Sequence, residues 1–108
     1  MTCEICDRTR IIERDGFILD PSGDITWGGQ VVRNLGTVAP SILYELARAN
    51  GRRLSADFLA GNCCGGEILD ARGNIRVHVF RIRQKFRQLG FPIPIGTERN
   101  VPGYWWAV

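Results

Sequence analysis

The sequence predicts an α+β domain in which a small antiparallel β-meander precedes three helices and a C-terminal β-hairpin. Apolar residues recur at steps of four and three between residues 73 and 89, which is the spacing of one face of an α-helix. Short β-favouring runs separated by turn residues fill 17–35 and 91–108. At 108 residues and 44% hydrophobic content, the chain is long enough for one domain with a modest core.

The meander begins at Phe17, where β-favouring runs alternate with turn residues. Pro-Ser-Gly-Asp at 21–24 and Gly-Gly at 28–29 are residues typical of turns. The predicted strands are FILD at 17–20, ITW at 25–27 and QVVRNL at 30–35. Residues 1–14 are expected to form an N-terminal arm, as a short helix or a frayed terminus, ahead of the domain at 15–108.

Two helices are predicted after the meander. Thr37 is a good N-cap for a helix from Val38 to Asn50, and Gly51 follows as a stop. Ser55 caps a second helix over residues 56–64. The expected buried positions are Val38, Ile42, Leu46 and Ala49 in the first helix and Phe58, Leu59 and Cys63 in the second.

The stretch from Gly73 to Leu89 predicts a third helix with one apolar side and one basic side. Its apolar stripe consists of Ile75, Val79, Ile82, Phe86 and Leu89. Residues 71–99 carry a net charge of +6, against +3 for the whole chain, and no carboxylate falls between Asp70 and Glu98. At about 100° per residue, the side chains expected to point away from the core are Arg76, Val77, Phe80, Gln84 and Arg87, with Arg81 and Arg83 on the flanks.

Two explanations of this basic side remain open. A solvent-exposed helix is the ordinary explanation of a charge run, but such helices usually mix both signs. A helix that enters the major groove of DNA needs an exposed face of positive charge. The single sign of the charges favours the second explanation.

The last segment predicts a β-hairpin directly after the basic helix. Two prolines limit Phe91–Ile95 to an edge or irregular strand, and Thr97–Gly103 holds the turn. Tyr104–Val108 is the closing strand. Trp105 and Trp106 must then point to opposite faces of this strand, with one of them in the core.

This order of elements is that of a winged helix-turn-helix preceded by a meander. Four segments resemble the DNA-binding effector domain of OmpR/PhoB-type response regulators. Leu35-Gly36-Thr37 resembles the family's approach to its first helix, and Asn50–Ser55 resembles its G-x-x-(V/L)-S link into the second. Ile75–Phe86 resembles its recognition helix, V-D-V-H-I-x-R-L-R-K-K-L, and Thr97–Tyr104 resembles its wing, T-V-R-G-x-G-Y. The resemblance covers about residues 17–108.

The resemblance implies that the helix at 73–89 enters the major groove and that the wing at 95–106 lies on the DNA backbone and minor groove. It implies base contacts at Val77 and Arg81. An arginine can grip guanine with two hydrogen bonds, and an apolar side chain can pack on a thymine methyl. The candidate DNA-binding residues are Asn74, Arg76, Val77, His78, Phe80, Arg81, Arg83, Gln84, Arg87, Thr97 and Arg99.

The sequence also departs from the family pattern. Arg76 replaces the usual acid and Phe80 replaces a usually polar residue, so we expect a different base preference. Pro102 adds one residue to the wing. The 108 residues hold no receiver domain, so we expect no phosphorylation input. The loop at 65–72 stands where the family's loop can touch RNA polymerase, which makes it a candidate polymerase contact.

Zinc is the main chemical alternative, and it finds little support. Cys3 and Cys6 have the spacing of half a zinc site, whereas Cys63 and Cys64 are adjacent. Adjacent helix residues point about 100° apart and make poor co-ligands, so buried or idle thiols are the simpler alternative. A redox role for Cys3 and Cys6 lacks the surrounding βαβ pattern. His78, the only histidine, is either a partly buried side chain or a phosphate contact.

These observations favour a sequence-specific double-stranded DNA-binding transcription regulator over an enzyme. We expect no cofactor, because no phosphate-binding glycine motif is present. We expect no membrane association and a cytoplasmic protein, because no apolar run approaches roughly 20 residues and no signal-peptide core opens the chain. A homodimer on DNA is a further expectation. The alternative is an adaptor that uses the same fold to bind RNA polymerase or another regulator.

Overall fold

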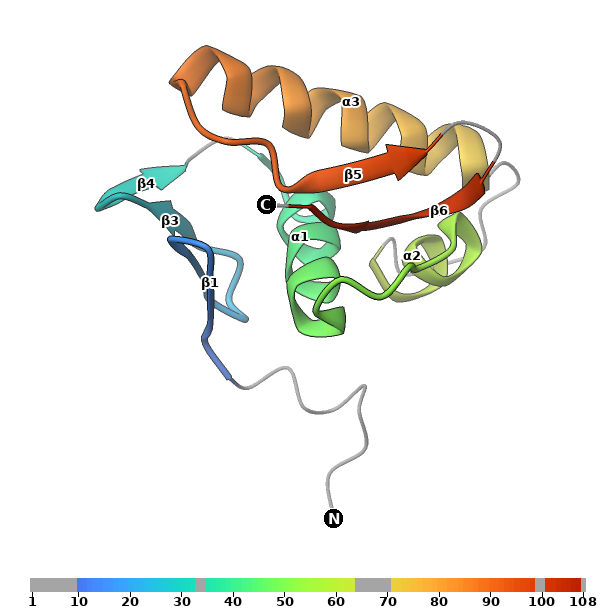
Figure 1. The fold of residues 1–108 in the computed structure, drawn as a ribbon, viewed down its shortest axis with the longest axis horizontal. Helices are drawn as coiled ribbons and strands as arrows, with labels where there is room; N and C mark the ends of the chain where they lie inside the picture. Colours follow the sequence, from blue (N-terminus) through green and yellow to red (C-terminus); the bar gives the residue numbers. More distant parts are fainter. Residues whose placement is uncertain (1–9, 33–34, 64–70, 99–100, 108) are drawn as a thin grey trace.

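The structure is a computed structural model that describes residues 10–32, 35–63, 71–98 and 101–107. A four-stranded antiparallel sheet is followed by three helices and a two-stranded hairpin (Figure 1). The elements are β1 Ile12–Arg14, β2 Phe17–Leu19, β3 Ile25–Trp27, β4 Gln30–Val32, α1 Val38–Ala49, α2 Ala56–Cys63, α3 Ala71–Leu89, β5 Ile95–Glu98 and β6 Val101–Trp106. The predicted α+β class is confirmed. No helix within these described ranges is long and apolar enough to cross a membrane.

The sheet contains one strand more than the sequence analysis predicted. Its order is β1-β2-β3-β4, and β1 falls at Ile12–Arg14, where a short helix or frayed terminus was expected. The reason is the dipeptide Asp15-Gly16, whose φ angles of 53° and 87° allow a two-residue hairpin turn between Arg14 and Phe17. Asp-Gly is a strong hairpin signal in a sequence. Residues 1–9 of the predicted arm lie outside the described residues.

Alternation along the strands gives the sheet one buried face and one exposed face. Phe17, Leu19 and Ile25 are buried, while Ile18 and Val31 lie exposed on the opposite face. The fourth strand ends at Val32, short of the predicted 30–35, and residues 33–34 of that range lie outside the described residues. The meander therefore covers the core with its inner side only.

The two predicted helix caps behave differently. The hydroxyl of Ser55 accepts a hydrogen bond from the Phe58 backbone N–H at 3.0 Å, which confirms the cap of α2. The side chain of Thr37 makes no capping bond to α1. Helix α1 ends with Asn50 in the left-handed conformation, one residue before the predicted stop at Gly51.

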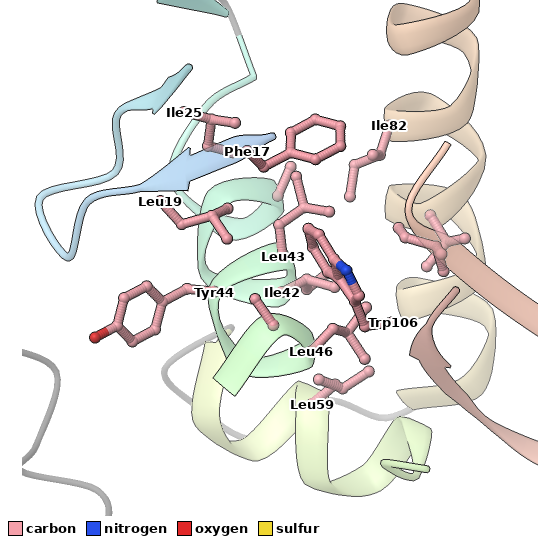
Figure 2. Close-up of a cluster of buried hydrophobic side chains, with 14 of the residues drawn as sticks. Phe17, Leu19, Ile25, Ile42, Leu43, Tyr44, Leu46, Leu59, Ile82 and Trp106 are labelled. Atoms are coloured by element: carbon pink, nitrogen blue, oxygen red, sulfur yellow. The ribbon is translucent and has the colours of Figure 1, made fainter. Parts of the chain in front are cut away.

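The core gathers around α1, which contacts β1, β2, α2, α3 and β6. Figure 2 shows Ile42, Leu43 and Leu46 pointing from α1 into the space between the meander and α3. All three side chains are fully buried. The prediction that Phe58 of α2 is buried was wrong, because it is 41% exposed and Ala60 is buried instead.

An aromatic cluster joins the sheet, α3 and the hairpin. The Phe17 ring stacks on the Phe86 ring of α3, with 5.7 Å between the ring centres. It also meets the Trp106 ring of β6 edge-on, with 5.5 Å between the ring centres. The indole N–H of Trp106 donates a hydrogen bond to Asp15 Oδ2 at 2.7 Å. The tip of the β1–β2 hairpin is thereby tied to the last strand of the chain.

The two strands of the hairpin occupy other residues than predicted. Residues 91–94 form no strand, and β5 and β6 extend into the expected turn, with an irregular register between Gly96 and Glu98. A Cβ at Gly96 would lie 2.5 Å from the Trp105 ring nitrogen, so only glycine fits under that ring. Trp106 is buried while Trp105 stays partly exposed, which confirms that the two point to opposite faces.

Candidate nucleic-acid interface

Helix α3 is fixed to the core by the stripe that its spacing predicted. Ile75, Val79, Ile82 and Phe86 are all buried, and Leu89 packs partly against the same core. The helix has 19 residues and is therefore about 28 Å long. Its other side is free to meet a ligand along most of this length.

The outward side of α3 combines basic, polar and apolar groups. The side chains predicted to point away from the core are all exposed, and Asn74 and Arg81 are exposed beside them. Two members of this face are large and apolar: Phe80 is 61% exposed and Val77 is 47% exposed. The exposed members of the face are Asn74, Arg76, Val77, Phe80, Arg81, Gln84 and Arg87.

Arg83 lies on the flank that faces the hairpin, and it links the two elements. Its Nη2 group donates hydrogen bonds to the Ile95 carbonyl oxygen and to Thr97 Oγ1, each at 3.1 Å. Two residues predicted to contact DNA, Arg83 and Thr97, are thus bonded to each other. Their contact sets the position of β5 relative to α3.

Arg53 is a functional candidate that the sequence analysis missed. Its guanidinium lies 4.7 Å from the centre of the Trp105 ring, and its Nη2 lies 2.6 Å from Glu98 Oε2. Next to it, the backbone groups of Leu54 and Tyr104 exchange two hydrogen bonds at 2.8 and 2.9 Å. The segment between α1 and α2 therefore contacts both strands of the hairpin and helps to hold it in place.

Two open hollows flank the outward face of α3. The first, about 480 Å³, lies between α3, the hairpin and the start of α2, and we call it the wing hollow. The second, about 500 Å³, lies between α3 and the start of α1, and we call it the α1 hollow. The wing hollow is lined by Arg72, Arg76, Phe80, Thr97 and Pro102, among others, and the α1 hollow by Thr37, His78, Arg81, Gln84 and Lys85, among others.

His78 lies on the side of α3 that borders the α1 hollow. It is partly buried, and this burial lowers its pKa below the usual 6.5, with a further lowering from the positive charge of Arg81. This shift favours the neutral imidazole, which can both donate and accept a hydrogen bond.

Several predicted features fall on residues that the structure does not describe. They are Arg99 of the candidate interface, residues 65–70 of the candidate polymerase loop, and Cys3, Cys6 and Cys64 of the candidate zinc set. Cys63 is partly buried and packs against the core. Among the described residues, no three histidine, cysteine or acidic side chains gather to hold a metal.

This chain is similar to known proteins in its structure, although no similarity is found from its sequence alone. No protein-family model matches the sequence, and no curated protein matches it. The RstA DNA-binding domain from Klebsiella pneumoniae, solved in complex with the RstA box, has a TM-score of 0.72 and 28% identity, covering 91% of this chain and 97% of that one. The DNA-binding domain of CpxR from E. coli has a TM-score of 0.72 and 27% identity, covering 90% and 95%.

A more distant structure gives the same architecture. The DNA-binding domain of the response regulator AdeR, solved in complex with an intercistronic region, has a TM-score of 0.74 and covers 87% of this chain and 96% of that one. Its identity is 16%, so this likeness concerns the fold alone. The resemblance read from the sequence is confirmed: this chain has the winged helix-turn-helix fold of the DNA-binding domains of OmpR/PhoB-type response regulators.

Proposed function

We propose that this protein regulates transcription by binding specific sequences of double-stranded DNA. Helix α3, over residues 73–89, enters the major groove, and the wing at 95–106 lies on the adjacent backbone and minor groove. The observation that carries the proposal is the outward side of α3, which is exposed along its length and bears no carboxylate. The RstA domain, which was solved in complex with the RstA box, supports it through its similarity to this chain.

The shape of this surface suits a duplex. With its side chains, a helix is about 10–12 Å across, and the major groove of B-DNA is about 12 Å wide. The outward face of α3 forms a ridge with the wing hollow on one side and the α1 hollow on the other. Each phosphate backbone that borders the groove would lie over one hollow, where Arg72 on one side and Lys85 on the other supply positive charge. Two carboxylates, Asp57 and Glu98, also line the wing hollow, and Glu98 is paired with Arg53.

The residues divide into two roles under this proposal. Arg76, Arg81 and Arg87 are exposed, so they are free to reach guanines or phosphates. Arg83 acts through its bonds to β5, because its contact with Thr97 positions the wing. Contact with RNA polymerase through residues 65–72 and dimerisation on DNA remain expectations of the same proposal.

The test is selection from a random pool of DNA duplexes at near-physiological salt. We expect the wild-type protein to enrich a motif and the Arg81→Ala variant to lose it. The control is Arg52→Ala, an exposed arginine beside Phe58 and away from both hollows, which should select the same motif. A motif that Arg81→Ala selects as well as the wild type would contradict the placement of α3 in the groove.

A second function is favoured by a different surface. Ile11, Ile18 and Val31 are exposed and apolar, and Ile18 and Val31 lie on the outer face of the meander. Such side chains suit a protein partner, as an adaptor would need. In that case a pull-down retrieves one protein, and DNA binding stays nonspecific at roughly 10⁻⁴–10⁻⁶ M. A sharp footprint without any partner would exclude the adaptor.

A further inference from the structure

We infer that Phe80 and Val77 form an apolar reading patch that recognises the C5-methyl groups of thymine. This inference rests on the proposed DNA binding and adds the class of base pair that the protein selects. Phe80 is the most exposed of the large hydrophobic side chains among the described residues. It stands on the side of α3 opposite the buried Ile82 and Phe86, so packing within this chain does not account for it.

The surroundings of the patch restrict what it can meet. Arg76 and Arg87 lie on one side of it and Arg81 on the other, all exposed. A partner must therefore satisfy several positive charges and one apolar patch at the same time. A DNA duplex offers both, because its phosphates carry the charge and the thymine methyl is the apolar group that the major groove presents.

The spacing along the helix fits neighbouring base pairs. Val77 and Phe80 are three residues apart, which is a rise of about 4.5 Å, close to the roughly 3.4 Å between stacked bases. Gln84 continues the same line one turn later, and its amide can bind adenine N6 and N7. A helix that lies along the groove would thus place two methyl-reading side chains and one adenine-reading side chain in sequence.

These positions predict a recognition site with a centre rich in A·T pairs. From Val77 to Gln84 the helix rises about 10.5 Å, which spans about three base-pair steps. The arginines on both sides of the patch would read guanines or phosphates outside this centre.

The experiment uses the duplex that the wild-type protein enriches from a random pool. Each central thymine is replaced in turn by uracil, which lacks only the methyl group. We expect each contacted position to weaken binding about fourfold, the effect of losing one buried methyl-sized group. The Phe80→Ala variant should bind the thymine and uracil duplexes equally, whereas Phe80→Leu should keep part of the discrimination.

The matched control is Phe58→Ala, which removes the other exposed phenylalanine, on α2 and outside both hollows. It should discriminate thymine from uracil as the wild type does. A motif without central A·T pairs, or equal binding of thymine and uracil by the wild type, would overturn the inference and leave DNA recognition intact. Full discrimination by a folded Phe80→Ala variant would also overturn it. If the pool yields no motif at all, the proposed function fails, and the inference fails with it.

Discussion

Asp15 combines two local roles, and both affect the stability of the domain. It occupies the turn between β1 and β2 with a φ of 53°, a left-handed conformation that aspartate and asparagine tolerate better than most residues. Its carboxylate also accepts the hydrogen bond from the Trp106 indole, 91 positions along the chain. One residue thus forms the turn of the first hairpin through its backbone and binds the last strand through its side chain.

We expect Asp15→Ala to lower the free energy of unfolding by about 2 kcal/mol. The lost partner of a partly buried indole N–H costs about 1–3 kcal/mol, and alanine adds strain in the left-handed turn. Asp15→Asn keeps an acceptor oxygen and tolerates the turn, so it should stay close to the wild type. Urea unfolding of the three proteins measures the difference, and an Asp15→Asn variant as unstable as Asp15→Ala would contradict the reasoning.

His78 should make stability depend on pH in a defined direction. Burial, and then the positive charge of Arg81, lowers its pKa in the folded protein below the usual 6.5. The folded state therefore favours the neutral imidazole, and this contribution is present above about pH 6.5 and lost as the pH falls toward the lower folded pKa. Between about pH 7 and pH 5, the wild type should lose slightly more stability than His78→Gln. Urea unfolding at the two pH values measures this loss for each protein. If the wild type and His78→Gln lost the same free energy of unfolding between pH 7 and pH 5, this linkage would be ruled out.

At the scale of the element, the N-caps of α1 and α2 show that a favourable residue type does not guarantee a capping hydrogen bond. Ser55 and Thr37 are both good N-cap residues by type, but only Ser55 makes the capping bond. The hydroxyl of Ser41 instead donates a hydrogen bond to the Thr37 carbonyl oxygen at 3.1 Å. The backbone conformation of Thr37 is itself helical, which is unusual for a cap.

We expect Ser55→Ala to lower the free energy of unfolding by about 1 kcal/mol, because the Phe58 N–H loses its acceptor. Thr37→Ala should change it by no more than a few tenths of a kcal/mol, since no capping bond is lost. Thermal or urea unfolding of both variants tests the contrast. A larger effect at Thr37 than at Ser55 would mean that the two caps are assigned the wrong way round.

Helix α3 was predictable because its signal is local and repeated. Four buried positions recur at steps of four and three residues, so one residue that departs from the pattern does not obscure the helical spacing. Helix α2 has eight residues and little amphipathicity, and there the burial of Phe58 was predicted wrongly. Strand β1 was not predicted, although Asp15-Gly16 is a typical hairpin turn. The strand has only three residues, which is too short to show a clear alternation of apolar and polar side chains.

At the scale of the whole molecule, the contacts that place the wing join segments far apart in the sequence. Arg53 and Glu98 are 45 positions apart, and no spacing rule connects them. Arg83 and Thr97 are 14 apart, and sequence reasoning assigned both to DNA without detecting that they bond to each other. The sequence therefore predicts which face of α3 is exposed, whereas the angle of the wing against that face depends on tertiary contacts.

The charge distribution of the whole chain leads to a prediction about salt. Residues 71–99 carry +6 and the remaining residues carry −3, so the positive charge is concentrated in the segment that contains α3. Each phosphate contact adds about −0.9 to the slope of log K against log salt concentration. Lys85 lines the α1 hollow on the flank of α3, so under the proposed DNA binding we expect it to contact a phosphate and not a base.

Lys85→Ala should therefore weaken binding to all duplexes and reduce the magnitude of the salt slope by about one. It should still select the wild-type motif, unlike Arg81→Ala, which should lose the motif. Arg52→Ala should leave both the slope and the motif unchanged, because Arg52 lines neither hollow. Titration of a fluorescent duplex at several salt concentrations gives the slope. A Lys85→Ala protein with an altered motif and an unchanged slope would place this flank of α3 at the bases and would require the helix to be rotated in the groove.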